Sequence, residues 1–181
     1  MDKNIINVAN NHKSEFTFFL NNIFPHLMLW EGGGKLHNVS GDSGGWTIWG
    51  IAYNYNKQHF SSFEDFKNTT EEEAAALAFS KYYLPLNPAY LPCNTKLYMA
   101  DMAYNLGTGR TIKYMQQCIK TTADGIIGKN TRAKMSDLTL PCIHRKRVDW
   151  YNYLARHKGK GKFINGWMRR ATDSYSKSKD C

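Results

Sequence analysis

Residues 30–51 read WEGGGKLHNVSGDSGGWTIWGI, a dense cluster of glycines with only two acidic residues, Glu31 and Asp42. Glycine loses more conformational freedom on folding than any other residue. Such a cluster is therefore tolerated where the backbone turns sharply or approaches another group closely. We interpret the stretch as the rim of a cleft, with Glu31 at its start as a candidate acid.

The segment before this stretch has the periodicity of a helix. Its apolar residues recur at three- and four-residue steps, at Phe16, Phe19, Leu20, Ile23, Leu27 and Trp30. This spacing predicts an amphipathic helix that carries Glu31 at its C-terminal end. Pro25 leaves open one bent helix or two short ones. After the glycines, Trp46, Ile48 and Ile51 predict a short strand or ribbon.

Two further helices are marked by their end signals. Thr69 or Thr70 is a candidate N-cap, followed by three acidic residues and a run of helix formers that lasts until Pro85. Residues 95–107 predict another helix, which Gly107 would end. The patterns that follow are short and helical. The sequence therefore predicts a mainly α protein with one small β element.

The charge is unevenly distributed along the chain. Residues 1–109 contain 7 Lys and Arg against 10 Asp and Glu, whereas residues 110–181 contain 17 against 5, an excess of 12 positive charges. Such a basic half indicates a surface for a polyanion such as nucleic acid, anionic lipid or a wall polymer. The alternative is a solvated face that serves solubility only. We predict two lobes with these bounds.

Other functional classes leave little trace in the sequence. No apolar run is long enough to span a membrane, and the first 15 residues lack the apolar run of a secretory signal, so we expect synthesis in the cytoplasm. The cysteines and histidines lack metal-ligand spacing. We expect reduced thiols, with one disulfide as the alternative. The four cysteines are Cys93, Cys118, Cys142 and Cys181.

The two acids of the glycine-rich stretch fit glycosidic bond cleavage. This reaction needs an acid that protonates the leaving oxygen and a carboxylate that stabilises the sugar cation or activates water. At the end of an apolar helix, partial burial of Glu31 would favour the protonated acid. Asp42 in a polar loop should stay ionised, and the Thr47 hydroxyl could hold a water. The spacing of the two residues alone also fits the alternative that Glu31 only ends a helix and Asp42 only lies in a turn, with no catalytic role for either.

The stretch resembles the signature of glycoside hydrolase family 108. The matching positions are Glu31, Gly32, Gly33, Asn38, Asp42, Gly44, Gly45, Thr47, Gly50 and Ile51, with Trp49 where an aromatic residue is usual. This chain departs from the family pattern in two ways. It has two more residues than the pattern between Gly33 and Asn38, and it has Val39 and Ser40 where the pattern has Asp-Pro. A second carboxylate would therefore have to be Asp42. The Glu, Asp, Thr order is also similar to that of small phage lysozymes.

The resemblance continues downstream. Asp101, Asn105 and Gly107 match the end of a family helix. Residues 124–131, DGIIGKNT, resemble the start of the accompanying predicted peptidoglycan-binding domain, although the same residues would also form a glycine-rich turn capped by Asp124. The closing pattern of that domain matches Arg147, Tyr151, Phe163, Gly166, Trp167 and Arg170.

The resemblance implies a lysozyme-like helical fold with a β ribbon near the active site and a C-terminal wall-binding lobe. It implies an N-acetylmuramidase that cleaves the β-1,4 bond between N-acetylmuramic acid and N-acetylglucosamine, without metal or cofactor. The catalytic candidates are Glu31, Asp42 and Thr47. The substrate-binding candidates are Asn38, Trp49, Asn105, Asp124, Arg147, Trp167 and Arg170.

The expected partner is peptidoglycan, bound by a monomer that acts in the periplasm without stable membrane insertion and without nucleic acid. Phage lysis and the export of a toxin or protein across the wall both fit such an enzyme. Two alternatives stay open. The departures after Gly33 would fit a wall-binding module that has lost catalysis, and the basic half would fit a nucleic-acid-binding protein, although no recognition motif for nucleic acid is present.

Overall fold

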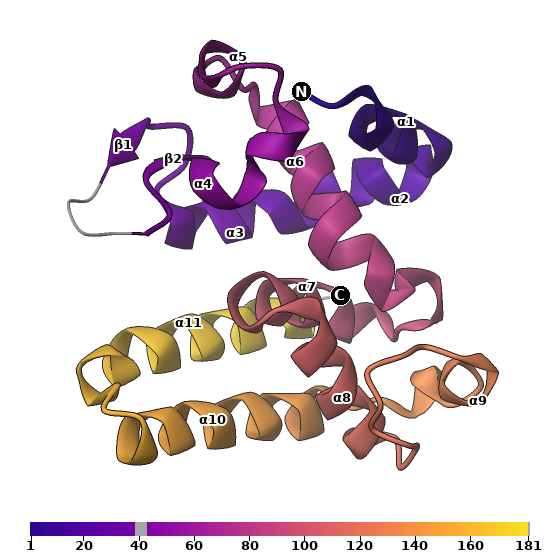
Figure 1. Cartoon of the computed structure of the whole chain (residues 1–181). Helices are drawn as coiled ribbons and strands as arrows, with labels where there is room; N and C mark the ends of the chain where they lie inside the picture. Colours follow the sequence, from indigo (N-terminus) through magenta and orange to yellow (C-terminus); the bar gives the residue numbers. More distant parts are fainter. Residues whose placement is uncertain (39–42, 181) are drawn as a thin grey trace. The chain divides into compact units, whose positions relative to one another are not determined.

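The computed structural model describes residues 1–38 and 43–180, and its chain forms two compact units, Met1–Lys81 and Tyr82–Cys181 (Figure 1). Both units are mainly helical, and unit 1 carries one small sheet, which confirms the predicted fold class. The boundary between the units precedes the predicted lobe boundary at residue 109. The helix that ends at Leu106 packs on the helices that follow it, and therefore belongs to unit 2.

Unit 1 contains six α-helices and three short helical turns within its described residues. They are α1 (Lys3–Asn11), α2 (Lys13–Phe18), η1 (Phe19–Ile23), α3 (Phe24–Glu31), α4 (Tyr53–Asn56), η2 (Lys57–His59), α5 (Phe63–Lys67), α6 (Glu71–Ala78) and η3 (Phe79–Tyr83), the last of which crosses into unit 2.

The helical path that leads to Glu31 is continuous but irregular. A π-helical turn, η1, joins α2 to α3, and Pro25 lies in the first turn of α3. Proline is tolerated at that position because the first backbone N–H groups of a helix have no intrahelical partner. Pro25 left open one bent helix or two short ones. The structure has two short helices, α2 and α3, that follow one another without a break through the wider turn η1.

A three-stranded antiparallel sheet, in the order β1-β2-β3, follows α3. Its strands are β1 (His37–Asn38), β2 (Trp46–Ile48) and β3 (Ile51–Ala52). Thr47 pairs with His37 on one side and with Ala52 on the other, and Ile48 pairs with Ile51. The expected ribbon after the glycines is confirmed.

Helix α6 packs on the N-terminal helices of unit 1. Thr70 caps it through a capping box, in which the Thr70 and Glu73 side chains bind each other's backbone N–H groups. The next residues, Ala74 to Ala78, are all buried, and such small side chains let α1 and η1 approach closely. At its end, the Phe79 ring contacts Phe16 edge-on, with ring centroids 5.3 Å apart.

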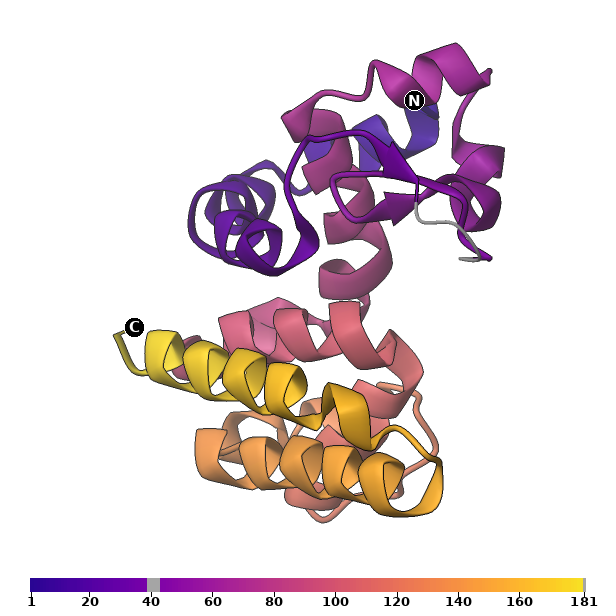
Figure 2. The same cartoon turned by 90° about the vertical axis from the view of Figure 1, so that its left-hand side faces the viewer.

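Unit 2 is built from helices α7, α8, α10 and α11. Its elements are η4 (Leu84–Leu86), η5 (Pro88–Tyr90), α7 (Cys93–Leu106), α8 (Thr108–Cys118), α9 (Lys129–Arg132), η6 (Met135–Asp137), α10 (Leu140–His157), η7 (Gly161–Phe163), α11 (Ile164–Lys177) and η8 (Ser178–Asp180). Helices α10 and α11 lie side by side, joined by the short turn η7 (Figures 1 and 2). Gly107 ends α7 with a φ of 85°, as the sequence predicts.

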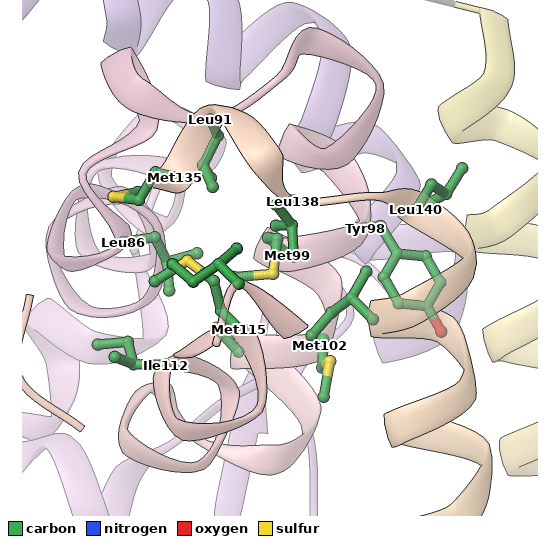
Figure 3. Close-up of a cluster of buried hydrophobic side chains, with 13 residues drawn as sticks. Leu86, Leu91, Tyr98, Met99, Met102, Ile112, Met115, Met135, Leu138 and Leu140 are labelled. Atoms are coloured by element: carbon green, nitrogen blue, oxygen red, sulfur yellow. The ribbon is translucent and has the colours of Figure 1, made fainter. Parts of the chain in front are cut away.

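Methionines and leucines fill the core of unit 2 (Figure 3). The buried residues of this core are Leu86, Leu91, Tyr98, Met99, Met102, Ala103, Ile112, Met115, Ile119, Met135, Leu138, Leu140 and Ile143. Methionine is unbranched and flexible, so it fills the irregular space left between helices that meet at different angles. Within the described ranges, every helix is too short or too polar to span a bilayer.

The expectation of reduced thiols is wrong for all three described cysteines, each of which is disulfide-bonded. Cys118, the last residue of α8, and Cys142, in the first turn of α10, form a disulfide with their Cα atoms 5.9 Å apart. The bridge closes the segment that carries α9 and so ties this mostly irregular region to the two helices beside it.

Candidate functional site

Glu31 is the last residue of helix α3 and is half-buried. The next two residues, Gly32 and Gly33, have φ angles of 78° and 63°, which side chains other than glycine adopt at a cost. Gly32 therefore caps the helix in the left-handed conformation and turns the chain away directly after Glu31. The glycines that made this stretch conspicuous place the carboxyl group at a helix end.

Trp49 fixes the loop that follows Glu31. With Gly50 it forms the two-residue turn between β2 and β3, and both residues have positive φ, 53° and 71°. This backbone is strained for a bulky residue. The Trp49 backbone N–H donates to the Gly33 carbonyl at 2.9 Å, and its indole N–H donates to the Thr69 carbonyl at 2.9 Å. Through its backbone and its side chain, this one residue ties the Glu31 loop, the ribbon and the start of α6 together.

Gly34→Ala should disturb this arrangement. A Cβ at Gly34 would lie 2.7 Å from Cε2 of the Trp49 ring, which is held by its hydrogen bond and cannot yield cheaply. We expect a loss of about 1–3 kcal/mol in the free energy of unfolding, as for overpacked sites. Urea unfolding measures it. Gly166→Ala is the control, because its Cβ meets nothing within 4 Å, and equal stability of both variants would contradict the expectation.

The other predicted residues of unit 1 lie on the ribbon or outside the described residues. Thr47 is half-buried in β2, and within residues 1–38 and 43–180 its hydroxyl makes one long contact, 3.5 Å, with the Gly45 carbonyl. Asn38 is exposed in β1, opposite Trp46. Asp42, the second predicted carboxylate, falls in residues 39–42, outside the described residues. Trp49, two residues after Thr47, bonds to Gly33 and so connects the ribbon that carries Thr47 to the loop after Glu31.

Several predicted residues of unit 2 meet in a buried polar network around Asp101. One carboxylate oxygen of Asp101 accepts from Arg147 at 2.7 Å and from the Ser174 hydroxyl at 2.8 Å, and the other accepts from Arg170 at 2.8 Å. The Asp101 and Arg147 side chains have no solvent exposure. The network therefore joins α7, α10 and α11 through charge.

The network reaches the surface through Tyr151. The Tyr151 hydroxyl accepts from Arg147 at 2.8 Å and donates to Asn105 at 2.6 Å, and Asn105 is exposed. Trp167 stacks on the Tyr151 ring with centroids 5.1 Å apart, and Phe163 stacks on Trp167 in turn. Asn105 and Trp167 are thus held rigidly at one end of α7 and α11.

Burial corrects two of the predicted substrate contacts, and a third, the exposed Asp124, has a structural role as well. Arg147 and Arg170 are buried and bonded to Asp101, so their guanidinium groups stabilise the fold and do not face solvent. Asp124 accepts from the Ile126 N–H at 2.8 Å and from Gln116 at 2.7 Å, which is the turn-capping role that its sequence context also allowed. These bonds lower the pKa of the Asp124 carboxyl.

The stability of the chain should fall in acid partly through Asp101. Burial alone would raise the pKa of its carboxyl, but the charges of Arg147 and Arg170 outweigh burial and lower it to about 2. A carboxyl with a lowered folded pKa stabilises the fold above its unfolded pKa, about 3.9, and loses that contribution as pH falls toward 2. We expect about 2 kcal/mol of the free energy of unfolding to disappear in this window.

Urea unfolding at pH 5 and at pH 2.5 measures this loss. Other carboxyls also titrate in the window, among them Asp65, whose pKa the Met1 amino group lowers. Asp101→Asn removes only the Asp101 share, so its unfolding free energy should depend less on pH than that of the wild type. Equal slopes for both proteins would contradict the assignment.

The sequence left two features of this region unassigned. The carboxylate at the centre of the network, Asp101, was noted only as part of a helix-end motif, and Ser174 carried no signal. An Asp inside an otherwise apolar helix was the available clue, because buried carboxylates are found with partners. Among the described residues, no three His, Cys, Asp or Glu side chains are grouped so that they would hold a metal ion.

Comparison with known proteins supports the resemblance and the fold. Residues 24–107 match the model of the family described as Glycosyl hydrolase 108. No curated protein matches the sequence. The solved structure of Brucella abortus SagA aligns with a TM-score of 0.71 and 22% identity, covering 93% of this chain and 95% of that chain. At this identity the likeness shows a common fold, which extends over both units.

Proposed function

Because residues 24–107 match the model of the family described as Glycosyl hydrolase 108, we propose that the chain is an N-acetylmuramidase that cleaves the β-1,4 bond between N-acetylmuramic acid and N-acetylglucosamine in peptidoglycan. The family match supports a glycoside hydrolase, and it is the observation that carries the proposal. The position of Glu31 at a glycine-turned helix end, followed by a loop that a strained Trp49 holds at Gly33, supports an active site at this point.

In the proposed reaction, Glu31 is the general acid that protonates the glycosidic oxygen as the bond breaks. Asp42 supplies the second carboxylate, which stabilises positive charge on the sugar ring or activates water. Thr47 positions that water through its hydroxyl. Its long internal contact at 3.5 Å leaves this hydroxyl weakly engaged, which suits such a role.

Each unit by itself carries two of the proposed substrate contacts. Asn38 on β1 and Trp49 on the β2–β3 turn lie next to the catalytic residues in the chain, and Asn105 and Trp167 form the end of the polar network of unit 2. The Trp49 indole N–H is engaged by Thr69, so this residue would present its ring and not its N–H to a sugar. The basic excess of residues 110–181 suits a wall polymer that bears carboxylates.

Two biological settings suit a muramidase of this kind. Either it degrades the wall during phage lysis, or it opens the wall for the export of a toxin or protein. In both settings the proposed site of action is the periplasm, and the proposed active form is a monomer.

Muropeptide analysis of purified Gram-negative sacculi tests the proposal. The wild type should release fragments with N-acetylmuramic acid at the reducing end. Fragments with N-acetylglucosamine at the reducing end would mean that the other bond of the glycan is cleaved. If the protein stays bound to sacculi and releases nothing, it is a wall-binding module without catalysis. Retention on DNA without any preference for sacculi would favour a nucleic-acid-binding protein.

A further inference from the structure

A row of stacked aromatic rings lies on one face of helix α10. Trp150 and Tyr153 are stacked with centroids 5.3 Å apart and planes 20° apart, and the His157 ring lies 5.1 Å from Tyr153. Arg110 of α8 covers the Trp150 ring at 3.9 Å. The positions are three and four residues apart, so the three rings share one helix face, here called the aromatic row (Trp150, Tyr153 and His157).

The aromatic row does not belong to the core. The buried side chains of α10 are Leu140, Ile143, Arg147 and Tyr151. Tyr153, by contrast, is 42% exposed, and His157 is exposed as well. Stacked rings left in solvent are an apolar surface without a partner, and such surfaces mark binding sites when polar groups surround them.

Two open hollows flank the aromatic row. One, of about 360 Å³, is lined by Asp149, Asn152, Tyr153, Arg156 and His157. The other, of about 290 Å³, is lined by Tyr114, Gln117, Lys146, Asp149, Trp150 and Tyr153. Tyr153 and Asp149 border both hollows, so the two form one elongated surface along α10 with the rings in its middle.

The chemistry of this surface fits a glycan of N-acetylated amino sugars that carries acidic peptides. The C–H face of a pyranose ring packs on exposed aromatic surface, which Tyr153, 42% exposed, offers between its neighbours Trp150 and His157. The amides of Gln117 and Asn152 can bond sugar hydroxyls and acetamido groups. Basic side chains at the edges, including Lys146, suit peptide carboxylates.

Single-stranded nucleic acid also binds to aromatic rings beside basic side chains, so it is the competing ligand. The position of Asp149 argues against it. This carboxylate borders both hollows, where it would repel a phosphate backbone, whereas it would accept hydrogen bonds from sugar hydroxyls.

We propose that the aromatic row with its two hollows is a saccharide-binding site on unit 2 that holds the glycan strand of peptidoglycan. This inference rests on the proposed function for the identity of the polymer. It assigns wall binding to a surface of α8 and α10 that contains none of the predicted site residues. The basic side chains attract the wall, and the rings supply the contact that persists when the charges are screened.

Co-sedimentation with purified Gram-negative sacculi tests the proposal. Both the parent protein and the variants carry Glu31→Gln, so that cleavage does not release them. Tyr153→Ala should lower the sacculus affinity about fivefold, the loss expected for one aromatic contact. Tyr90→Ala is the matched control, because Tyr90 is a tyrosine of the same unit, 50% exposed, beside Arg132. It should bind like the parent.

The loss should remain in about 0.5 M salt, where charge attraction is largely screened and stacking is not. Unchanged binding of Tyr153→Ala would overturn the proposal, as would equal losses in Tyr153→Ala and Tyr90→Ala. Loss of retention on single-stranded DNA with sacculus binding intact would assign the row to nucleic acid instead. Circular dichroism verifies that each variant is folded.

Failure of the proposed function has a different signature. It would appear as the absence of muropeptides from the wild type, or as equal release by the wild type and Glu31→Gln. The binding comparison does not depend on either result, because it measures retained protein and not products.

Discussion

Glu31→Gln should lower the cleavage of sacculi by about 100-fold or more, the range over which a positioned acid or base contributes to catalysis. Glutamine has the size of glutamate but carries no acidic proton, so the leaving sugar oxygen would depart unprotonated. The release of soluble muropeptides over time measures the rate. Binding to sacculi should be unchanged, because the substitution removes no volume.

The same substitution should leave the fold intact. Glu31 is the last residue of α3, and no basic residue lies in the last turn of that helix. A negative charge there faces the negative end of the helix dipole, which costs about 0.5 kcal/mol. A carboxylate at an unfavourable helix end is typical of a functional residue, because functional sites keep side chains that selection for stability alone would replace.

The control for Glu31→Gln is Glu72→Gln. Glu72 is an exposed glutamate in the first turn of α6, so this variant makes the same change of charge in the same unit. It should cleave sacculi like the wild type. If Glu31→Gln cleaved as fast as Glu72→Gln, Glu31 would not be the acid, and another carboxyl of the chain would have to take its place.

Local signals in the sequence predicted the elements that place Glu31. The glycines after it, the cap at Thr70 and the stop at Gly107 act over four residues or fewer, so each can be recognised without knowing the fold. The π-helical turn at residues 19–23 has no such signal. Its Phe19 and Ile23 side chains are buried, so the turn depends on the tertiary packing around it.

The residues that require distant partners were misread. Arg147 and Arg170 stand in a recognisable motif, and an arginine in a basic segment reads as a polymer contact. Their actual partner, Asp101, lies 46 and 69 positions away. Only the packing of α7 against α10 and α11 brings these charges together. The pairing of Cys118 with Cys142 depends on tertiary structure in the same way.

The aromatic row could not be predicted from the sequence either, because it depends on which rings are exposed. Nothing in the sequence around Trp150 distinguishes a surface tryptophan that could stack on a sugar from a core tryptophan. The deciding facts are the exposure of Tyr153 and the stacking of Arg110 from a different helix. Trp167, preferred from its motif, proves to be stacked between Tyr151 and Phe163.

Asp101→Asn should destabilise the protein by about 3–5 kcal/mol, the cost of breaking a buried ion pair from one side. The Arg147 side chain has no exposure and that of Arg170 is 7% exposed, so both positive charges would stay in the core with no carboxylate between them. For a chain of this size, such a loss lowers the melting temperature by about 10 °C. Thermal unfolding followed by circular dichroism measures it.

Three further variants decide whether charge causes this loss: Asp137→Asn, Arg170→Met, and Asp101→Asn combined with Arg170→Met. Asp137→Asn makes the same chemical change at an exposed position of η6 and should leave the melting temperature within about 2 °C of the wild type. In Asp101→Asn with Arg170→Met, one of the two stranded charges is gone, so part of the stability should return. If the double variant were as unstable as the sum of the single ones, the Asp101 carboxylate would act through packing alone. The ion pairs would then be incidental to the joining of α7, α10 and α11.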